Sequence, residues 1–195
     1  DRLAESAGYY EVGAKQHENL KKHLYRRYSL QKHYEDEGTP PLQDVKDKVS
    51  TVKLDGAAIS LLYIDGNLTQ VLTRGDGIEG TDITHLFLAR KDLVPLTSPR
   101  VDPFQVDGEI VAPKQIENSR NYAAGALSLK DPAEFCTRAI SFFAYGVHPY
   151  PNDTYKKDMV ELEAQGFETV LTPELENIYE CDGIVHRVNS NALFD

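Results

Sequence analysis

A lysine followed closely by an Asp-Gly pair is the first feature with chemical potential, in the segment Lys53-Leu54-Asp55-Gly56. Because side chains alternate along an extended backbone, Lys53 and Asp55 share one face of a predicted strand. Burial and neighbouring cations lower the pKa of a lysine amine, and a neutral amine can attack phosphorus and hold a nucleotide as a phosphoramidate. So short a segment also occurs by chance at surface turns, so it does not decide the function alone.

A glycine-rich run from Thr73 to Thr84 is the second feature. Gly75, Gly77 and Gly80 allow the backbone to approach a ligand closely. Arg74 offers a guanidinium fork to phosphate or ribose oxygens. Three acids alternate with these glycines as in a calcium loop, but the twelve-residue ligand pattern and its final bidentate glutamate are missing. The run therefore favours a nucleotide over a calcium ion.

Three further segments place charged residues beside predicted strands or among small residues. They are residues 106–111 with Glu109, residues 118–127 with Arg120, and residues 179–188 with Asp182 and Arg187. Each is a weak signal when it is taken singly.

The elements that must position these residues are mostly strands. Alternating or apolar runs predict strands over 51–55, 57–64, 68–73, 104–111 (kinked at Gly108), 140–147 and 184–188. Asp65-Gly66-Asn67 is a strong hairpin turn. A helix is predicted over 154–165, with Gly166 just past its end. Strands that arrive as hairpins and outnumber helices predict an α+β fold with antiparallel sheets.

Residues 1 to about 35 are predicted to be helical, because Leu20, Leu24 and Tyr28 recur at helical spacing. Glycine and prolines at 38–41 end the helix, so we divide the chain into a helical segment and linker, 1–48, and a main domain, 49–195. Cations gather in the first segment, either as a solvated helix face or as a phosphate-contacting helix: Lys21, Lys22, Arg26, Arg27 and Lys32.

Composition limits the class of protein. The chain has 195 residues, with 21 Lys plus Arg against 31 Asp plus Glu, a net charge of −10. That balance argues against a phosphate-backbone partner and by itself favours an enzyme of small molecules. Cys136 and Cys181 form no CxxC motif, so we expect a reducing cytoplasm and no disulfide scaffold or zinc site. We expect no membrane span and no signal peptide, because no apolar run is long enough.

The order and spacing of the segments are more specific than any one of them. From Val52 to Ser190 the chain resembles the adenylation (nucleotidyltransferase) domain of NAD-dependent DNA ligases. The segments KLDG, TRGDGxxGxDIT, GE, NSRNxAAGxL, FFAYGV and DGIV occur in family order. TRGDG followed by NxRNxAAG is typical of the NAD-dependent class. The resemblance implies an ATP-grasp-like nucleotidyltransferase fold, with antiparallel sheets flanked by helices and preceded by an N-terminal helix.

The resemblance also implies catalytic roles. Lys53 would attack the adenylyl phosphorus of NAD and expel nicotinamide mononucleotide, and the lysyl-AMP would then serve to seal nicks in DNA. Asp55 matches the carboxylate of the lysine motif. Arg74 and Arg120 match arginines near the nucleotide, where they would supply positive charge. Glu109 matches the glutamate of the GE strand, near the ribose or a divalent metal.

The same resemblance implies a set of nucleotide-binding residues. Tyr145 would stack on adenine, since a ring face is a platform for a purine. Gly56, Asp182 and Arg187 match further positions at the nucleotide, which Lys53, Arg74 and Glu109 would also contact. Mg²⁺, held by Glu109 and Asp182, would stabilise charge in the in-line displacement.

Several positions depart from the family pattern. The family's charged residues are replaced at Thr51, Asp107, Ser128 and Glu174, and Arg187 stands where a lysine is usual. The segment before the lysine motif lacks the family's Tyr- and Asp-rich signature, and the last basic motif is not reached. These departures indicate a divergent, truncated ligase component, such as a split-ligase subunit of the kind some phages use.

The expected partners follow from that interpretation. They are nicked double-stranded DNA and either a second ligase subunit or the OB-fold, zinc and helix-hairpin-helix modules, with no membrane. Two alternatives stay open, because the departures remove phosphate-contacting groups. One is an ATP-dependent or RNA-directed covalent nucleotidyltransferase, and the other is a catalytically weakened module that binds nucleotide or DNA.

Overall fold

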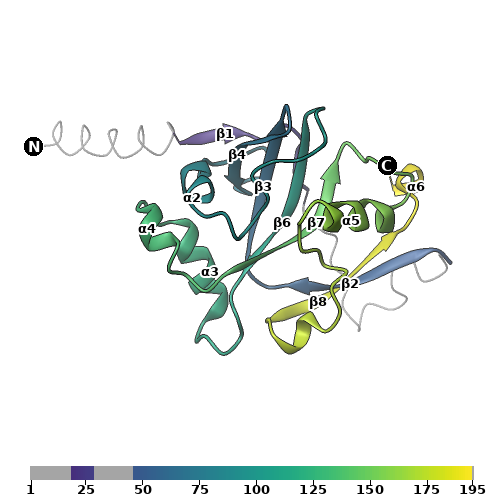
Figure 1. Cartoon of the computed structure of the whole chain (residues 1–195). Coiled ribbons are helices and arrows are strands. Elements are labelled where there is room, and N and C mark those ends of the chain that lie inside the picture. The colour runs from purple at the N-terminus through teal and green to yellow at the C-terminus, as the bar shows by residue number, and fades with distance from the viewer. Residues whose placement is uncertain (1–18, 29–45, 195) are drawn as a thin grey trace, which may run out of the picture.

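A four-stranded antiparallel sheet is the centre of the computed structural model, which describes residues 19–28 and 46–194 (Figure 1). Its strands, in spatial order, are β4 (Asn67–Thr73), β3 (Ala57–Ile64), β6 (Phe104–Val111) and β7 (Ser141–His148). β3 and β4 form the predicted hairpin, and Asp65 and Gly66 have positive φ values of 52° and 76° in its turn. This is the backbone that an Asp-Gly turn favours.

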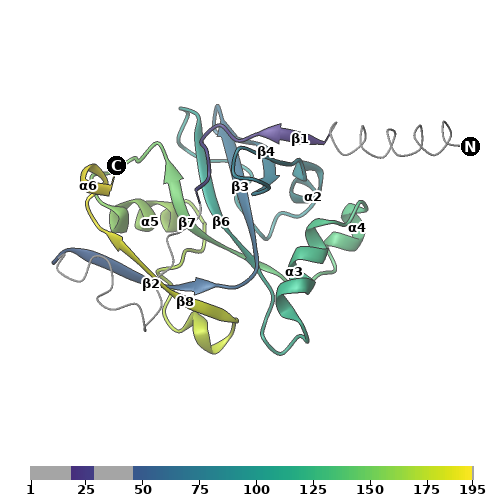
Figure 2. The same ribbon diagram turned by 180° about the vertical axis from the view of Figure 1, so that it is seen from behind.

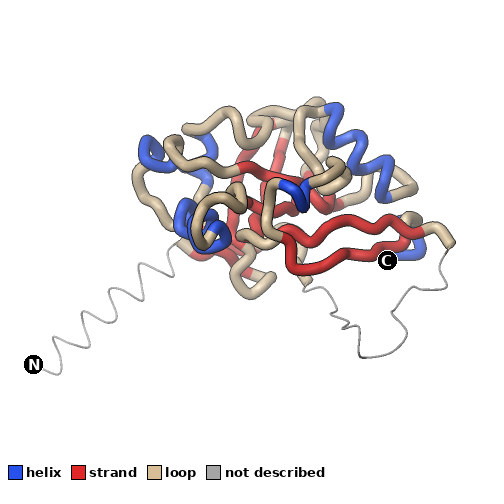
Figure 3. The backbone as a smooth tube through the Cα atoms, turned by 90° about the horizontal axis from the view of Figure 1, so that it is seen from below, coloured by secondary structure: helices blue, strands red, loops and turns tan. Residues whose placement is uncertain are grey.

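Two small antiparallel sheets complete the β structure. β1 (Leu20–Lys22) pairs with β5 (Glu79–Thr81), and β2 (Lys48–Leu54) pairs with β8 (Cys181–Val188). The β2–β8 ribbon joins strands that are far apart in the sequence. It crosses below the central sheet in Figure 1, and Figure 3 shows its two strands side by side. The α+β class with antiparallel sheets is therefore confirmed.

Short helices surround the sheets (Figure 2). They are α2 (Thr84–Leu88), α3 (Ser119–Leu127), α4 (Pro132–Phe135), α5 (Tyr155–Ala164), the 3₁₀ turn η2 (Leu175–Asn177) and α6 (Asn191–Phe194). The helix predicted over 154–165 is present as α5. The Thr154 hydroxyl accepts a hydrogen bond from the Lys157 amide at its start, and Gly166 follows its end with a φ of 104°. Within the described ranges, no helix has the length and apolar character needed to span a membrane.

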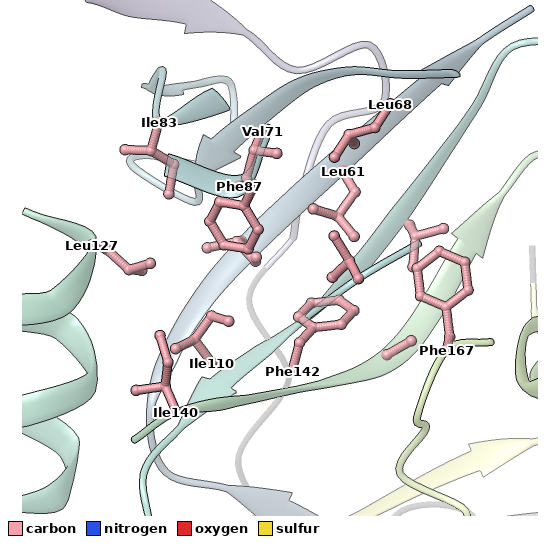
Figure 4. Close-up of a cluster of buried hydrophobic side chains, with 14 of the residues drawn as sticks. Leu61, Leu68, Val71, Ile83, Phe87, Ile110, Leu127, Ile140, Phe142 and Phe167 are labelled. Atoms are coloured by element: carbon pink, nitrogen blue, oxygen red, sulfur yellow. The ribbon is translucent and has the colours of Figure 1, made fainter. Parts of the chain in front are cut away.

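The main hydrophobic core lies on one face of the central sheet and includes side chains from α2, α3, α4 and α5. Figure 4 shows part of it around Leu61, Ile110 and Phe142. Side chains alternate along β6, so that Phe104, Val106 and Ile110 enter this core. Gly108 faces it too, and a Cβ there would lie 2.3 Å from Cζ of Phe142. The residues between them point to the other face of the sheet: Gln105, Asp107 and Glu109.

A second, smaller core joins that other face to the β2–β8 ribbon. It contains Leu54 from β2, Val111 from β6 and Phe143 from β7, together with Val170 and Leu175. The ribbon therefore packs on the face of the sheet that carries the polar residues of β6.

The prediction of a helix near the N-terminus is wrong for the part that the structure describes. Residues 20–22 form β1, and no helix occurs between residues 19 and 28. Leu24 and Tyr28 are exposed, whereas His23 and Arg27 are buried. The pairing of β1 with β5 and the burial of His23 and Arg27 outweigh the helical spacing of the apolar residues. Residues 1–18 and 29–45, including Lys32, lie outside the described residues.

Candidate functional site

Lys53 lies near the end of β2, opposite an irregular point in its partner strand. The pairs Val52–Ile184 and Leu54–Cys181 leave Lys53 facing both Asp182 and Gly183. An extra residue of this kind re-aims neighbouring side chains. Here the Lys53 Nζ lies 3.5 Å from the Asp182 Oδ2, with side chains 34% and 46% exposed.

Asp55 and Gly56 carry the chain from the ribbon into the central sheet. The Asp55 amide donates to the Glu180 carbonyl at 2.9 Å, and its Oδ1 lies 3.4 Å from Nε of Arg120, which is near the start of α3. Gly56 packs directly on β6, because a Cβ there would lie 2.0 Å from the Ile110 carbonyl oxygen. Only glycine fits where the chain passes so close to β6. This close approach places Lys53 and Asp55 at the end of the central sheet.

Glu109 is the most perturbed acid of this group. Burial raises the pKa of its carboxyl to about 7; Arg27 and Lys53 oppose the shift, while Asp55 and Asp182 add to it. These effects place Glu109 within electrostatic range of both carboxylates. The structure therefore brings residues from β2, β6, α3 and β8 into one charged group: Lys53, Asp55, Glu109, Arg120 and Asp182.

Tyr145 borders this group from β7. Asp107 pairs with Gly146 and Gly108 with Ala144, so Tyr145 is an extra residue in its strand and its ring is aimed by the irregularity. Burial raises the pKa of its hydroxyl well above the usual range, with Arg27 opposing and nearby carboxylates adding to the shift, so the hydroxyl stays protonated.

The glycine-rich run touches the site through its backbone. The Arg74 amide donates to the Ala58 carbonyl at 3.0 Å, and Ala58 is the β3 partner of Glu109. The Asp76 carboxylate accepts hydrogen bonds from the amides of Ile78 and Glu79 at 2.9 and 2.7 Å. Asp76 thus closes the turn of the loop.

Arg187 lies elsewhere on the ribbon. It pairs with Val49, four residues along β2 from Lys53, which is about 13 Å in an extended strand. Its guanidinium lies 4.2 Å from the Tyr155 ring centroid and donates to Asn191. Of the predicted site residues, Arg187 is the one that this register separates from Lys53.

One buried pair beside the site was not among the predicted site residues. The Arg27 Nε lies 3.6 Å from the Asp107 Oδ1, and both side chains are nearly inaccessible. The sequence pointed to one member of this ion pair, because Asp107 stands where the resemblance leads us to expect an arginine. Its cationic partner lies 80 residues away, where no local pattern could identify it.

The comparison with protein families tests the resemblance that these motifs indicate. Residues 18–116, just over half of the chain, match the model of the NAD-dependent DNA ligase adenylation domain. The chain belongs to this family. The resemblance inferred from the motif order is thus confirmed.

Curated relatives agree with the family assignment. The chain is 33% identical over 153 residues to a DNA ligase of Wolinella succinogenes, covering 68% of this chain and 23% of the relative. It is 33% identical over 182 residues to one of Psychrobacter arcticus, covering 73% and 26%. For one of Chlorobium chlorochromatii the identity is 32% over 186 residues, covering 77% and 28%. The chain thus spans about a quarter of these relatives.

Proposed function

We propose that this chain performs the adenylation step of an NAD-dependent DNA ligase, with Lys53 as the nucleophile, on a nucleotidyltransferase fold. The observation that carries the proposal is the convergence of Lys53, Glu109 and Arg120 on one site from separate segments. Family membership supports the reaction, and the convergence supports the location.

The proposed step is a displacement at phosphorus. The Lys53 amine loses a proton to solvent, and its nitrogen attacks the adenylyl phosphorus of NAD. An N–P bond forms while the bond from phosphorus to the bridging oxygen breaks, so nicotinamide mononucleotide leaves. Arg74 and Arg120 are proposed to neutralise the phosphate as charge develops.

The ionic contact of Lys53 suits this role. Its 3.5 Å separation from Asp182 exceeds the roughly 2.8 Å of a charge-assisted hydrogen bond. Exposed pairs of this kind contribute about 0–1 kcal/mol. The amine can therefore exchange Asp182 for a phosphate at little cost.

The acids of the site fit a hard divalent cation. Burial and two nearby carboxylates raise the pKa of Glu109, and a cation would relieve that surplus of negative charge. No group of three or more metal-ligating side chains is arranged for a metal among the residues described. Mg²⁺ commonly takes one or two carboxylates and fills its shell with phosphate and water oxygens. Glu109 and Asp182 would hold it, and when bound it would neutralise charge on the transferred phosphate.

We further propose that nicked DNA is held mainly by protein outside this chain, in another subunit or in further ligase modules. The net charge of −10 supports this division. A DNA site built on few cations neutralises few phosphates and therefore binds weakly. We expect weak binding of nicked duplex by this chain at physiological salt, measured by fluorescence anisotropy. Tight binding would contradict the division.

The test of the adenylation proposal is intact-mass spectrometry after incubation with Mg²⁺ and either NAD or ATP. We expect one acid-labile AMP adduct with NAD. An adduct from ATP alone would support the ATP-dependent alternative and contradict NAD use. Nucleotide binding without an adduct from either would support the weakened binding module.

A further inference from the structure

The segment that contains Arg27 is bound directly to the glycine-rich loop. The His23 amide donates to the Ile78 carbonyl at 2.9 Å, and the Arg27 amide donates to the Gly77 carbonyl at 2.8 Å. A Cβ at Gly77 would lie 2.2 Å from the Arg27 carbonyl oxygen. The two backbones are therefore in contact, and the position of the loop depends on this segment.

The Arg27 side chain continues from this contact onto the polar face of the central sheet. Its Nη1 donates to the Ile59 carbonyl at 2.8 Å and lies 3.5 Å from the Ser60 hydroxyl. Its Nη2 donates to the hydroxyl of Tyr145, and the guanidinium lies 5.5 Å from the centroid of that ring. Arg27 thus connects the glycine-rich loop, β3 and Tyr145.

The carboxylate beside Arg27, that of Asp107, is held through one of its oxygens, and its Oδ2 lies 3.9 Å from Nε2 of His148. Its Oδ1 accepts hydrogen bonds from the Ser60 hydroxyl and from Nε2 of Gln105, both at 2.9 Å. The Gln105 amide also bonds the backbone N–H and carbonyl of Tyr25. Gln105 therefore links the Asp107 carboxylate to the backbone of segment 23–28, and this link holds the Arg27 guanidinium against the sheet.

The arrangement leaves Arg27 poorly suited to hold a phosphate. Its Nη1 and Nη2 already have acceptors on Ile59, Ser60 and Tyr145, and its Nε faces the Asp107 carboxylate at 3.6 Å. Its side chain is 5% exposed. It is suited instead to hold the Tyr145 ring through its hydroxyl. The backbone of Tyr145 is held separately, because the Tyr155 hydroxyl donates to the Tyr145 carbonyl at 2.7 Å.

We infer that Arg27 is a positioning residue for the nucleotide base: its fork fixes the Tyr145 ring as the surface on which the base stacks, and its backbone ties that surface to the glycine-rich loop. This inference rests on the proposed function and on the stacking role that the family resemblance implies for Tyr145, because it needs a nucleotide at that ring. It assigns Arg27 to base binding, and it differs from the phosphate-contacting role considered for these cations in the sequence.

The experiment must separate positioning from simple pairing of buried charge. Arg27→Met removes the guanidinium beside the buried Asp107 carboxylate and leaves only His148, 3.9 Å away, as a possible counter-charge. Loss of function in this variant alone would therefore not separate the two roles. The double variant Arg27→Met/Asp107→Asn removes both charges and restores electrical balance. Arg27→Lys keeps the charge but cannot reach both Ile59 and Tyr145. Arg26→Met, an exposed neighbour, is the matched control.

The readouts are the melting temperature, the NAD dependence of adduct formation, and the Kd for AMP from calorimetry. We expect the double variant and Arg27→Lys to recover most of the melting temperature that Arg27→Met loses. Both should keep a KM for NAD and a Kd for AMP raised about tenfold, with the maximal adduct rate little changed. Arg26→Met should match the wild type.

Recovery of the KM and the Kd together with the melting temperature would overturn the inference, because pairing of charge would then be the whole role of Arg27. AMP binding reports on Arg27 even without chemistry. If the wild type binds AMP but forms no adduct, the proposed function fails, while the Kd values still test Arg27. If the wild type binds no AMP, both fail.

Discussion

Arg27 and Asp107 meet against the polar face of the central sheet, where their side chains are 5% and 9% exposed. The side chains of Lys53 and Asp182 on the ribbon are 34% and 46% exposed. The separations of the charged atoms are similar, 3.6 and 3.5 Å. The buried pair cannot change partners without leaving an unpaired charge in the protein, but the exposed pair can. The buried pair therefore holds the polar face together, whereas the exposed pair is free to exchange partners.

The largest effect should come from removing one charge of the buried pair. Asp107→Asn leaves the Arg27 guanidinium without its counter-ion, which costs about 3–5 kcal/mol in the free energy of unfolding. Asp182→Asn, the same change on the ribbon, should cost less than about 1 kcal/mol. Urea denaturation of both variants measures the contrast, and equal losses would show that the two pairs do not differ as described.

The next effect is a pH dependence of stability that comes from Glu109. Its carboxyl lies within electrostatic range of Arg27 in the buried pair and of Lys53 and Asp182 in the exposed pair. The pKa of Glu109 is raised from 4.5 to about 7, so between these values the folded protein keeps a proton that the unfolded chain has released. Stability from this group is therefore lost as pH rises from about 4.5 to 7 and is constant above.

Glu109→Gln removes that dependence. The variant should match the wild type near pH 4 and be more stable near pH 8, by up to about 3 kcal/mol, since one pKa unit equals 1.4 kcal/mol. Denaturation curves at the two pH values test this. A difference that is the same at both would contradict the burial of the Glu109 carboxyl.

A smaller effect is expected from one methyl group behind the polar face. Gly108→Ala places a Cβ 2.3 Å from Cζ of Phe142 and 2.5 Å from the Phe143 carbonyl oxygen, so we expect a loss of about 1–3 kcal/mol. Gly125→Ala in α3 meets no atom within 4 Å and should gain about 0.5–1 kcal/mol. Thermal melts of the two variants should shift in opposite directions; two losses would contradict the packing of β6.

The smallest effect on stability should accompany a large effect on chemistry. Arg120→Gln breaks an exposed contact with Asp55 and should change the free energy of unfolding by less than about 1 kcal/mol. The rate of adduct formation should fall about 100-fold, because a group that stabilises developing charge is lost. A quenched-flow time course measures the rate. An unchanged rate would remove Arg120 from the proposed site.

The sequence predicted the local parts of the fold well. The hairpin at Asp65-Gly66-Asn67 and helix α5 with Gly166 depend on residues a few positions apart, and both are present. The pairing of β2 with β8 and the Arg27–Asp107 contact join distant residues, so periodicity cannot reveal them. Leu20, Leu24 and Tyr28 predicted a helix, but strand pairing and the burial of His23 and Arg27 determine this segment.

The candidate site was predictable only as a set of motifs. Motif order selected Lys53, Glu109 and Asp182, while the irregular pairing that brings Asp182 beside Lys53 appears only in the structure. Arg187 was selected by the same motif order, yet its register places it toward Tyr155. Its role at the nucleotide stays a prediction.

The most direct measurement is the identity of the modified lysine. After incubation with NAD and Mg²⁺, tandem mass spectrometry of proteolytic peptides should find AMP on Lys53. Lys53→Arg should abolish the adduct, whereas Lys48→Arg on the same strand should not. An adduct on another lysine, or one that persists in Lys53→Arg, would contradict the account.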